Sequence, residues 1–288
     1  MRPAPFAYHR PDTRTEVDDL LARHGTGAKI LAGGQSLVPI LNMRLAAYER
    51  LIDINRLRDE PTEPGAAGDF VSFGPLVRQQ EAERSALVAD RAPLVAEIMR
   101  HIAHPAIRSR GTMVGSVAHA DPAAELPVAL ALAGGEVTAR RQGWSRVIGA
   151  GDLFTGPLAT SLEEGEWVEE VRFPTAAPGS GWAFEEFAQR SGDYALCGVA
   201  ARAQSGGDYF SVAVSWLGMG DVPRSTALGN FSSTDVAGPP LEEAIGKAVA
   251  DLRPGDDIHA SAEYRSWLAR RLAMRAVRRA VAATGTGG

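Results

Sequence analysis

The sequence predicts an α+β protein of two domains, and three observations lead to this prediction. Its 288 residues exceed the usual size of one domain. Short apolar stretches of strand length alternate with stretches of helical periodicity along the chain. A Pro- and Gly-rich segment at residues 174–181 is the best linker candidate. We therefore expect a larger domain at residues 1–176, with subdomains at about 1–57 and 58–176, and a smaller α+β domain at residues 180–284.

The composition is that of a globular protein without attraction for nucleic acid. Hydrophobic residues make up 45% of the chain and charged residues 23%, and the net charge is −5. No apolar run reaches bilayer length, and the amino terminus lacks the apolar core of a signal peptide. The single cysteine, Cys197, cannot form an internal disulfide or its own iron–sulfur cluster, and its apolar neighbours favour burial. We expect a cytoplasmic protein with no nucleic-acid partner, no membrane span and no metal site of its own.

The first predicted unit combines helices with parallel strands. A helix at residues 16–24 has acidic residues in its first turn and basic residues in its last, and Gly25 ends it. Residues 28–31 are short and apolar enough for a buried strand, and apolar residues recur at helical spacing from Leu37 onward. Residues 50–54 predict a second strand, parallel to the first.

The remaining elements follow from the same patterns. Residues 60–69 are rich in Pro and Gly and predict a loop. Short strands and glycine turns between residues 136 and 173 favour antiparallel pairing. The other expected elements are strands at residues 70–73, 136–139, 167–173, 182–188, 195–203 and 209–217, and helices at residues 78–88, 90–101, 241–251 and 260–283, with a further helix capped by Asp121 and Pro122 and ending at Gly134.

The glycine turn Ala32-Gly33-Gly34-Gln35-Ser36-Leu37 is the strongest functional signal in the chain. Adjacent glycines lack Cβ, so the backbone can turn sharply and a ligand can approach it closely. Gln35 and Ser36 lie where a helix begins, and the unpaired N–H groups and dipole of a helix start attract phosphate. An ordinary strand-to-helix turn is an equal alternative, because the motif is neither a dinucleotide fingerprint nor a Walker loop.

A second glycine stretch, at residues 110–127, has the same chemistry. Gly111 and Gly115 permit close backbone approach, and Thr112 and Ser116 supply hydroxyl donors. Two such turns could hold the two halves of a pyrophosphate.

Four stretches of the chain resemble the FAD-binding middle subunits of the molybdenum hydroxylases, of which the carbon monoxide dehydrogenase flavoprotein is the best-known type. The matches occur in the family's order and at similar spacing, and together they span nearly the whole chain. They are residues 32–37, 108–126, 189–195 and 257–265.

The resemblance implies a fold and a cofactor. The larger domain would be an FAD-binding domain of the vanillyl-alcohol-oxidase (PCMH) type, in two subdomains with FAD between them. The pyrophosphate would lie against the backbone of residues 32–37 and of residues 112–116, which include Val114. Glu125 would lie near the ribose or ribityl hydroxyls and Tyr194 near the isoalloxazine. His119, inside the second stretch, would either contact the flavin or fix the loop.

The resemblance also implies a function, that of the flavoprotein subunit of an oxidoreductase complex. In such complexes substrate is hydroxylated at a molybdenum–pterin centre in a large subunit, and electrons pass through [2Fe–2S] clusters in a small subunit to FAD and then to an external acceptor. The cofactor supplies the chemistry, so no catalytic residue is expected in this chain. The implied assembly is a dimer of heterotrimers.

Two alternatives remain open. A stand-alone flavin oxidoreductase would need a proton-transfer residue, for which Tyr194 and His119 are the candidates. A non-catalytic assembly subunit is suggested by Val114, which replaces the first glycine of the family's Thr-x-Gly-Gly, because a β-branched residue resists positive φ. The arginines of the last helix predict either a solvated face or a docking surface for an acidic subunit.

Overall fold

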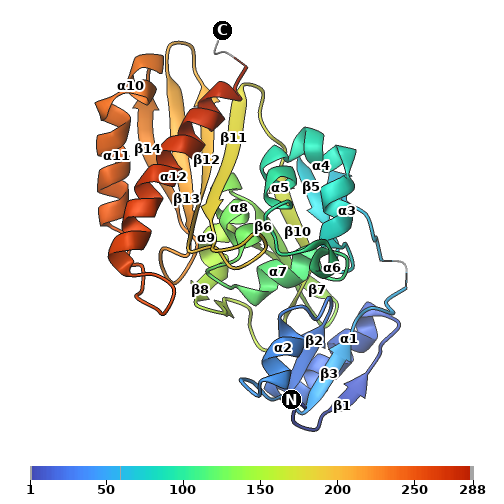
Figure 1. Cartoon of the computed structure of the whole chain (residues 1–288). Helices are drawn as coiled ribbons and strands as arrows, with labels where there is room; N and C mark the ends of the chain where they lie inside the picture. The colour runs from blue at the N-terminus through green and yellow to red at the C-terminus, as the bar shows by residue number, and fades with distance from the viewer. Residues whose placement is uncertain (1, 59, 286–288) are drawn as a thin grey trace.

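The computed structural model describes residues 2–58 and 60–285. Three units follow one another along the chain, an N-terminal unit, a central unit and a C-terminal unit (Figure 1). Each unit combines helices with its own sheet, which confirms the predicted α+β class. Among the described helices, none is both long enough and apolar enough to cross a membrane.

The N-terminal unit is a three-stranded parallel sheet in the order β1-β3-β2, which confirms the predicted parallel pairing. Its first helix ends at the predicted glycine, Gly25, which has a φ of 47°. The helix begins two residues earlier than predicted, because the Thr13 hydroxyl accepts a hydrogen bond from the Glu16 N–H at 3.2 Å and caps it. The elements are β1 (Ala7–His9), α1 (Arg14–His24), η1 (Gly25–Gly27), β2 (Ala28–Leu31), α2 (Leu37–Asn42) and β3 (Arg50–Asp53).

The central unit contains an antiparallel sheet in the order β4-β5-β10-β6-β7, and its helices cover one face. The antiparallel pairing agrees with the sequence pattern. The strands are β4 (Gly65–Ala67), β5 (Phe70–Phe73), β6 (Glu136–Arg141), β7 (Trp144–Gly149), β10 (Trp167–Pro174) and the small hairpin β8 (Phe154–Gly156) with β9 (Ala159–Thr160). The helices are α3 (Gln79–Arg84), α4 (Ala86–Arg91), α5 (Pro93–Ile98), α6 (Pro105–Arg108), α7 (Met113–His119), α8 (Glu125–Ala133) and α9 (Ala150–Leu153).

Two predictions for the central unit were wrong in detail. The two helices expected at residues 78–88 and 90–101 are three shorter helices. Ser85 has an extended backbone and caps α4 with its hydroxyl, which accepts from the Val88 N–H at 3.3 Å, and Pro93 starts α5. The segment expected to be a loop at residues 60–69 contains β4, which pairs with β5.

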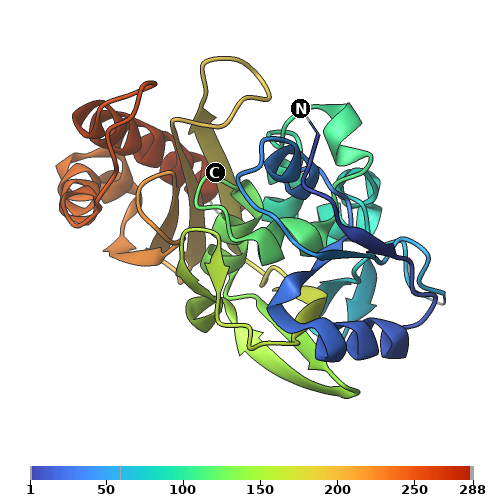
Figure 2. The same cartoon turned by 90° about the horizontal axis from the view of Figure 1, so that it is seen from below.

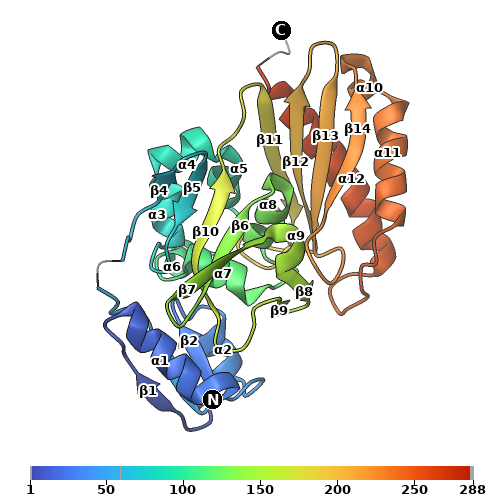
Figure 3. The ribbon, with the colours of Figure 1, turned by 180° about the vertical axis from the view of Figure 1, so that it is seen from behind.

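The C-terminal unit is an antiparallel meander in the order β11-β12-β13-β14 with two long helices against one face (Figure 3). Val199, Ala201 and Val214 point to this helical face and share its core with Leu272. Residues that alternate with them along the strands, such as Ala200, belong to the core of the central unit. The elements are β11 (Ser180–Phe187), β12 (Cys197–Ser205), β13 (Phe210–Leu217), β14 (Ser225–Phe231), α10 (Ser233–Ala237), α11 (Pro239–Ala250) and α12 (Ala262–Ala282).

The two outer units are joined to the central unit in different ways. The C-terminal sheet packs its second face directly on α5 and α8, so the two units share one hydrophobic core. The N-terminal unit is attached by a smaller apolar contact and a polar one. Leu76 and Trp167 pack in its core, and the buried Asp18 accepts from the indole N–H of Trp167 at 3.0 Å and from Arg140 at 3.0 Å. Figure 2 shows the result, with α1 beside the β6–β7 hairpin.

The contact of α12 with β11 depends on Gly181. A Cβ at this position would lie 2.8 Å from the Thr284 backbone nitrogen and closer still to the Ala280 carbonyl oxygen. We predict that Gly181→Ala lowers the free energy of unfolding by about 1–3 kcal/mol, the usual cost of overpacking. Gly246→Ala is the control, because its Cβ would meet open space in α11. That control should gain roughly 0.5–1 kcal/mol from helix propensity. Equal urea midpoints for the two variants would contradict the prediction.

Candidate functional site

The two glycine stretches lie against each other, although about 80 residues separate them in the sequence. A Cβ on Gly33 would lie 2.8 Å from the Gly111 Cα and closer still to the Arg110 carbonyl oxygen. A Cβ on Gly115 would lie 3.9 Å from that of Ala32. The structure therefore brings the two predicted loops together into one site.

The first loop leaves a row of backbone donors unused. Gly34 takes a φ of 73°, which turns the chain from β2 toward α2, and its carbonyl accepts from the Val38 N–H at 3.0 Å. The Gln35 side chain donates to the Gly33 carbonyl at 3.0 Å, and Leu37 is the first residue of α2. The N–H groups of residues 33–36 make no hydrogen bond with any other described residue. Consecutive free N–H groups of this kind form a concave site for an anion.

The second loop is more helical than the sequence predicted. Thr112 is the N-cap of α7, and its hydroxyl oxygen accepts from the Gly115 N–H at 3.0 Å. The Met113 N–H donates to the Val77 carbonyl at 3.1 Å, and the Ser116 N–H to the Thr112 carbonyl at 3.1 Å. These donors are thus occupied within the protein. Thr112 is only 2% exposed, whereas the half-buried Ser116 hydroxyl has no hydrogen-bond partner among the described residues.

Val114 lies inside α7, with the negative φ of a helical residue. Its side chain is 5% exposed and belongs to the core of the central unit. A β-branched side chain is therefore accommodated without a left-handed backbone, and its bulk points into the core.

A polar network that the sequence analysis missed ties the two loops together. Arg78 donates to the Arg110 carbonyl at 2.5 Å and to the Asn55 side-chain oxygen at 2.5 Å. Asn55 in turn donates to the Ala32 carbonyl at 2.8 Å and to Asp53 at 2.6 Å. Burial lowers the pKa of Arg78, and the nearby Arg110 adds to this effect. Asp53 ends β3 beside Leu31, which ends the parallel strand β2. The position of polar residues at the ends of two adjacent parallel strands was the sequence signal that could have revealed this network.

A second set of polar residues follows the C-terminal end of α7. The helix expected to start at Asp121 begins at Glu125 instead, because the Asp121 carboxylate accepts from the Ala123 N–H at 2.9 Å in a local turn. Loss of hydration and the Asp121 carboxylate raise the pKa of Tyr194 to about 12, although 67% of this side chain is exposed. Burial lowers the pKa of His119 at the end of α7.

Glu125 lies at the start of α8 in a cluster of titratable groups. Burial raises its pKa to about 7, and the charges of Glu186 and Asp121 act in the same direction while His101 opposes them. Glu186 forms an ion pair with His101 at 3.1 Å, and its second carboxylate oxygen is buried without a partner among the described residues. The nearby His104 packs its ring against Gly192.

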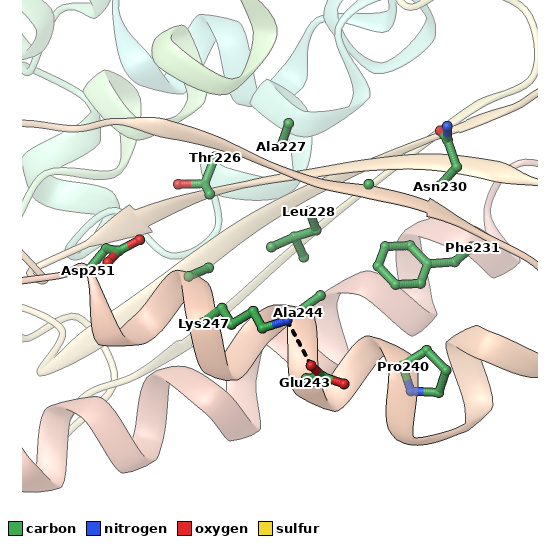
Figure 4. A pocket seen from close by; sticks show the side chains of 12 residues that line it. Thr226, Ala227, Leu228, Asn230, Phe231, Pro240, Glu243, Ala244, Lys247 and Asp251 are labelled. Atoms are coloured by element: carbon green, nitrogen blue, oxygen red, sulfur yellow. Dashed lines mark ion pairs between the residues drawn. The ribbon is translucent and has the colours of Figure 1, made fainter.

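A separate groove of about 510 Å³ lies between β14 and α11 (Figure 4). The Glu243–Lys247 ion pair at 2.7 Å is part of its wall. The groove contains no predicted site residue, and its lining consists of strand backbone and helix surface. The candidate site is therefore the pair of glycine loops with the adjoining polar groups.

Comparison with known proteins identifies the family. Residues 4–176 match the FAD binding domain in molybdopterin dehydrogenase, and residues 182–280 match the CO dehydrogenase flavoprotein C-terminal domain. The chain belongs to the FAD-binding medium subunits of the CO dehydrogenase-type molybdenum hydroxylases. It is thus a flavoprotein subunit of the oxidoreductase class.

Relatives of this flavoprotein subunit match it over nearly its whole length. The nicotine 6-hydroxylase medium subunit of Paenarthrobacter nicotinovorans is 38% identical over 281 residues, covering 96% of this chain and 98% of its own. The carbon monoxide dehydrogenase medium chain of Hydrogenophaga pseudoflava is 32% identical, covering 96% and 97%. A chain of the CO dehydrogenase of Oligotropha carboxidovorans superposes with a TM-score of 0.92 at 30% identity, covering 98% and 100%.

The residues present fit the phosphate part of the family's cofactor. The first loop offers four free N–H donors, and the second supplies hydroxyl groups. Gly33 cannot carry a side chain without clashing with the opposite loop. The Arg78 cation contacts the second loop directly and is linked to the first loop through Asn55. A concave, positively biased backbone surface of this kind suits a pyrophosphate.

The contact at Gly33 can be tested by adding one methyl group. We predict that Gly33→Ala weakens FAD binding about tenfold or more. The added Cβ would overlap the Arg110 carbonyl oxygen, and the two loops would have to move apart to relieve this clash. Gly151→Ala in α9 is the matched control, since its Cβ would meet no atom within 4 Å. Fluorescence titration with FAD measures both variants. An unchanged dissociation constant for Gly33→Ala would show that the loops do not act as one site.

The raised pKa of Glu125 makes stability depend on pH. The folded-state pKa of about 7 lies above the ordinary glutamate value of 4.5, so the stability that the neutral carboxyl provides is complete below pH 4.5 and is lost as pH rises through 7. Glu125→Gln removes the charge. We predict that it stabilises the FAD-free chain by about 1–3 kcal/mol more at pH 8 than at pH 5. Urea unfolding at both pH values measures this, and a pH-independent difference between variant and wild type would disprove it.

Proposed function

We propose that this chain holds FAD as the electron outlet of a three-subunit molybdenum hydroxylase. The bound FAD would supply the redox chemistry that accepts electrons from the [2Fe–2S] clusters of a small subunit and delivers them to an external acceptor. The observation that carries the proposal is the contact between the two glycine loops, beside which the N–H groups of residues 33–36 have no partner among the described residues.

We assign the cofactor contacts as follows. The backbone of Ala32–Leu37 and the hydroxyl groups of Thr112 and Ser116 hold the pyrophosphate, and Gly115 lets the loops approach. Val114 contributes through the core under this surface. Further assigned contacts are Glu125 to the ribose or ribityl hydroxyls, and His119 and Tyr194 to the ring. The FAD-binding domain would comprise residues 1–176 and the C-terminal domain residues 180–284.

The proposed partners are an iron–sulfur small subunit and a molybdenum-containing large subunit, assembled as a dimer of heterotrimers in the cytoplasm. Support comes from the family, whose solved members include the Cu,Mo-CO dehydrogenase. No acid–base step on substrate is assigned to this chain. The Tyr194 hydroxyl is protonated at neutral pH, as in any tyrosine, so this residue contributes a hydrogen-bond donor.

The experiment is to purify the chain alone and record its visible absorption before and after incubation with FAD and desalting. We expect flavin bands at one FAD per chain. The complete complex, co-expressed with its two partner subunits, is the positive control. If neither the chain nor the complex retains flavin, the proposal is wrong.

The variant Val114→Gly distinguishes the proposed function from the alternative role as a non-catalytic assembly subunit. Because Val114 is helical and buried, we predict that the variant binds FAD within about twofold of wild type and loses about 2–4 kcal/mol of stability from the core cavity and the helix glycine. FAD titration and urea unfolding are measured on the same preparation. A tenfold or larger gain in FAD affinity would mean that the valine obstructs the cofactor, and would favour the assembly role.

A further inference from the structure

Arg265 occupies a different environment from the other arginines of α12. The sequence predicted either a solvated basic face or a docking surface for this helix. Exposed Arg270 agrees with a solvated face, but Arg265 is only 7% exposed. It lies in the first turn of α12, within the stretch of residues 257–265 that the proposed function leaves without a role. A charged side chain at this depth needs specific partners.

Asp257 and a backbone carbonyl are the partners of Arg265. One guanidinium nitrogen donates to the Asp257 carboxylate at 2.6 Å, and another donates to the carbonyl oxygen of Leu196. Asp257 is itself fixed, because its other oxygen accepts from the N–H groups of His259 at 2.8 Å and Ala260 at 2.9 Å. The pair therefore links the loop before α12 to the chain just before β12.

Leu196 closes the segment that carries Tyr194. Its N–H donates to the Phe187 carbonyl at the end of β11 at 2.8 Å, and its carbonyl is held by Arg265. We call residues 188–196 the tyrosine loop. Tyr194 is exposed, and the Asp121 carboxylate is close enough to help raise the pKa of its hydroxyl. The base of the loop is therefore fixed at both of its ends, and its middle is held by the His104 ring against Gly192.

The same point also holds the segment that carries Asp121. Gly218, with a φ of 70°, donates its N–H to the Pro122 carbonyl at 3.1 Å. A Cβ on Gly218 would lie 3.3 Å from the Leu196 carbonyl oxygen and 3.9 Å from the Arg265 guanidinium. Leu196, Gly218 and Arg265 thus meet at one place. Leu196 is two residues from Tyr194 in the sequence, and Gly218 is hydrogen-bonded to Pro122, the neighbour of Asp121.

We propose that Arg265 and Asp257 are positioning residues for the cofactor site, which set the placement of Tyr194 relative to Asp121 through the Leu196 carbonyl. The inference rests on the proposed function, since it gives the C-terminal unit a defined role toward the flavin held by the other two units. Neither residue touches the cofactor. Removing the guanidinium would leave the Leu196 carbonyl and one Asp257 carboxylate oxygen without this partner, and the tyrosine loop would lose its fixed base.

The test compares Arg265→Met and Arg265→Lys with Arg270→Met. Arg270 is exposed on the same helix and makes no side-chain contact recorded among residues 2–58 and 60–285, so this control changes charge alone. Arg265→Lys keeps the charge but cannot reach two acceptors with one fork. The readouts are the FAD dissociation constant, the shape of the flavin absorption bands and the flavin midpoint potential, with far-UV circular dichroism as the folding check.

We expect Arg265→Met to weaken FAD binding by about fivefold to fiftyfold and to alter the flavin bands, with Arg265→Lys intermediate and Arg270→Met unchanged. Asp257→Asn should shift the bands in the same direction and serves if Arg265→Met fails to fold. The decisive comparison adds each change to Tyr194→Ala. If Arg265 acts through Tyr194, its effect on the bands and potential disappears in that background.

Two results would overturn the inference. The first is a folded Arg265→Met or Asp257→Asn variant with wild-type flavin bands, potential and affinity. The second is an equally large spectral effect with and without Tyr194, which would mean that Arg265 acts on the fold generally. Failure of the wild-type chain and complex to bind FAD would instead count against the proposed function, so the two failures are distinguishable.

Discussion

The close approach of Gly33 to the backbone of Arg110 and Gly111 is the constraint on which the candidate site depends. It brings a strand-to-helix turn of the N-terminal unit against a loop of the central unit, with no room for a side chain between them. The contact is held from behind by Arg78 and Asn55, whose hydrogen bonds reach the carbonyls of Arg110 and Ala32. The free N–H donors of this anion site come from the N-terminal unit, and the loop of the central unit lies directly against them.

The C-terminal unit contributes to the same site by a different physical route. Its sheet shares a hydrophobic core with the helices of the central unit, so the two are rigidly packed. Against that packed background, Arg265 and Asp257 hold the base of the tyrosine loop, which carries the exposed Tyr194. Glu125 and Glu186 place two carboxyl groups nearby, and burial favours the neutral form of Glu125 by raising its pKa to about 7. The site therefore combines a positively biased end at the loops with an acidic end at α8.

Local patterns in the sequence were enough for the parallel N-terminal unit, the antiparallel strands and the long C-terminal helices. They failed where the outcome depends on distant partners. Ser85 splits a helix by capping its second half, and Asp121 forms a local turn instead of the expected cap. For Val114 the replaced glycine suggested strain, but the residue lies in a helix with its side chain in the core.

The candidate site was predictable in part for the same reason. Both glycine stretches are visible in the sequence, because Gly and Ser before a helical pattern indicate a turn with exposed backbone N–H groups without reference to distant residues. Asn55 and Arg78 have no such signal, since their role exists only once the two loops meet. Arg265 looked like one more basic residue on an amphipathic helix, and only the fold places it beside Leu196.

The most direct test of the central claim is the ratio of dissociation constants for FAD and riboflavin, measured on the same preparation of this chain. If the paired loops bind the pyrophosphate, FAD should bind at least about a hundredfold tighter, the value of two or more hydrogen bonds to a charged group. Equal affinity for riboflavin would contradict the account, because the flavin ring alone would then determine binding.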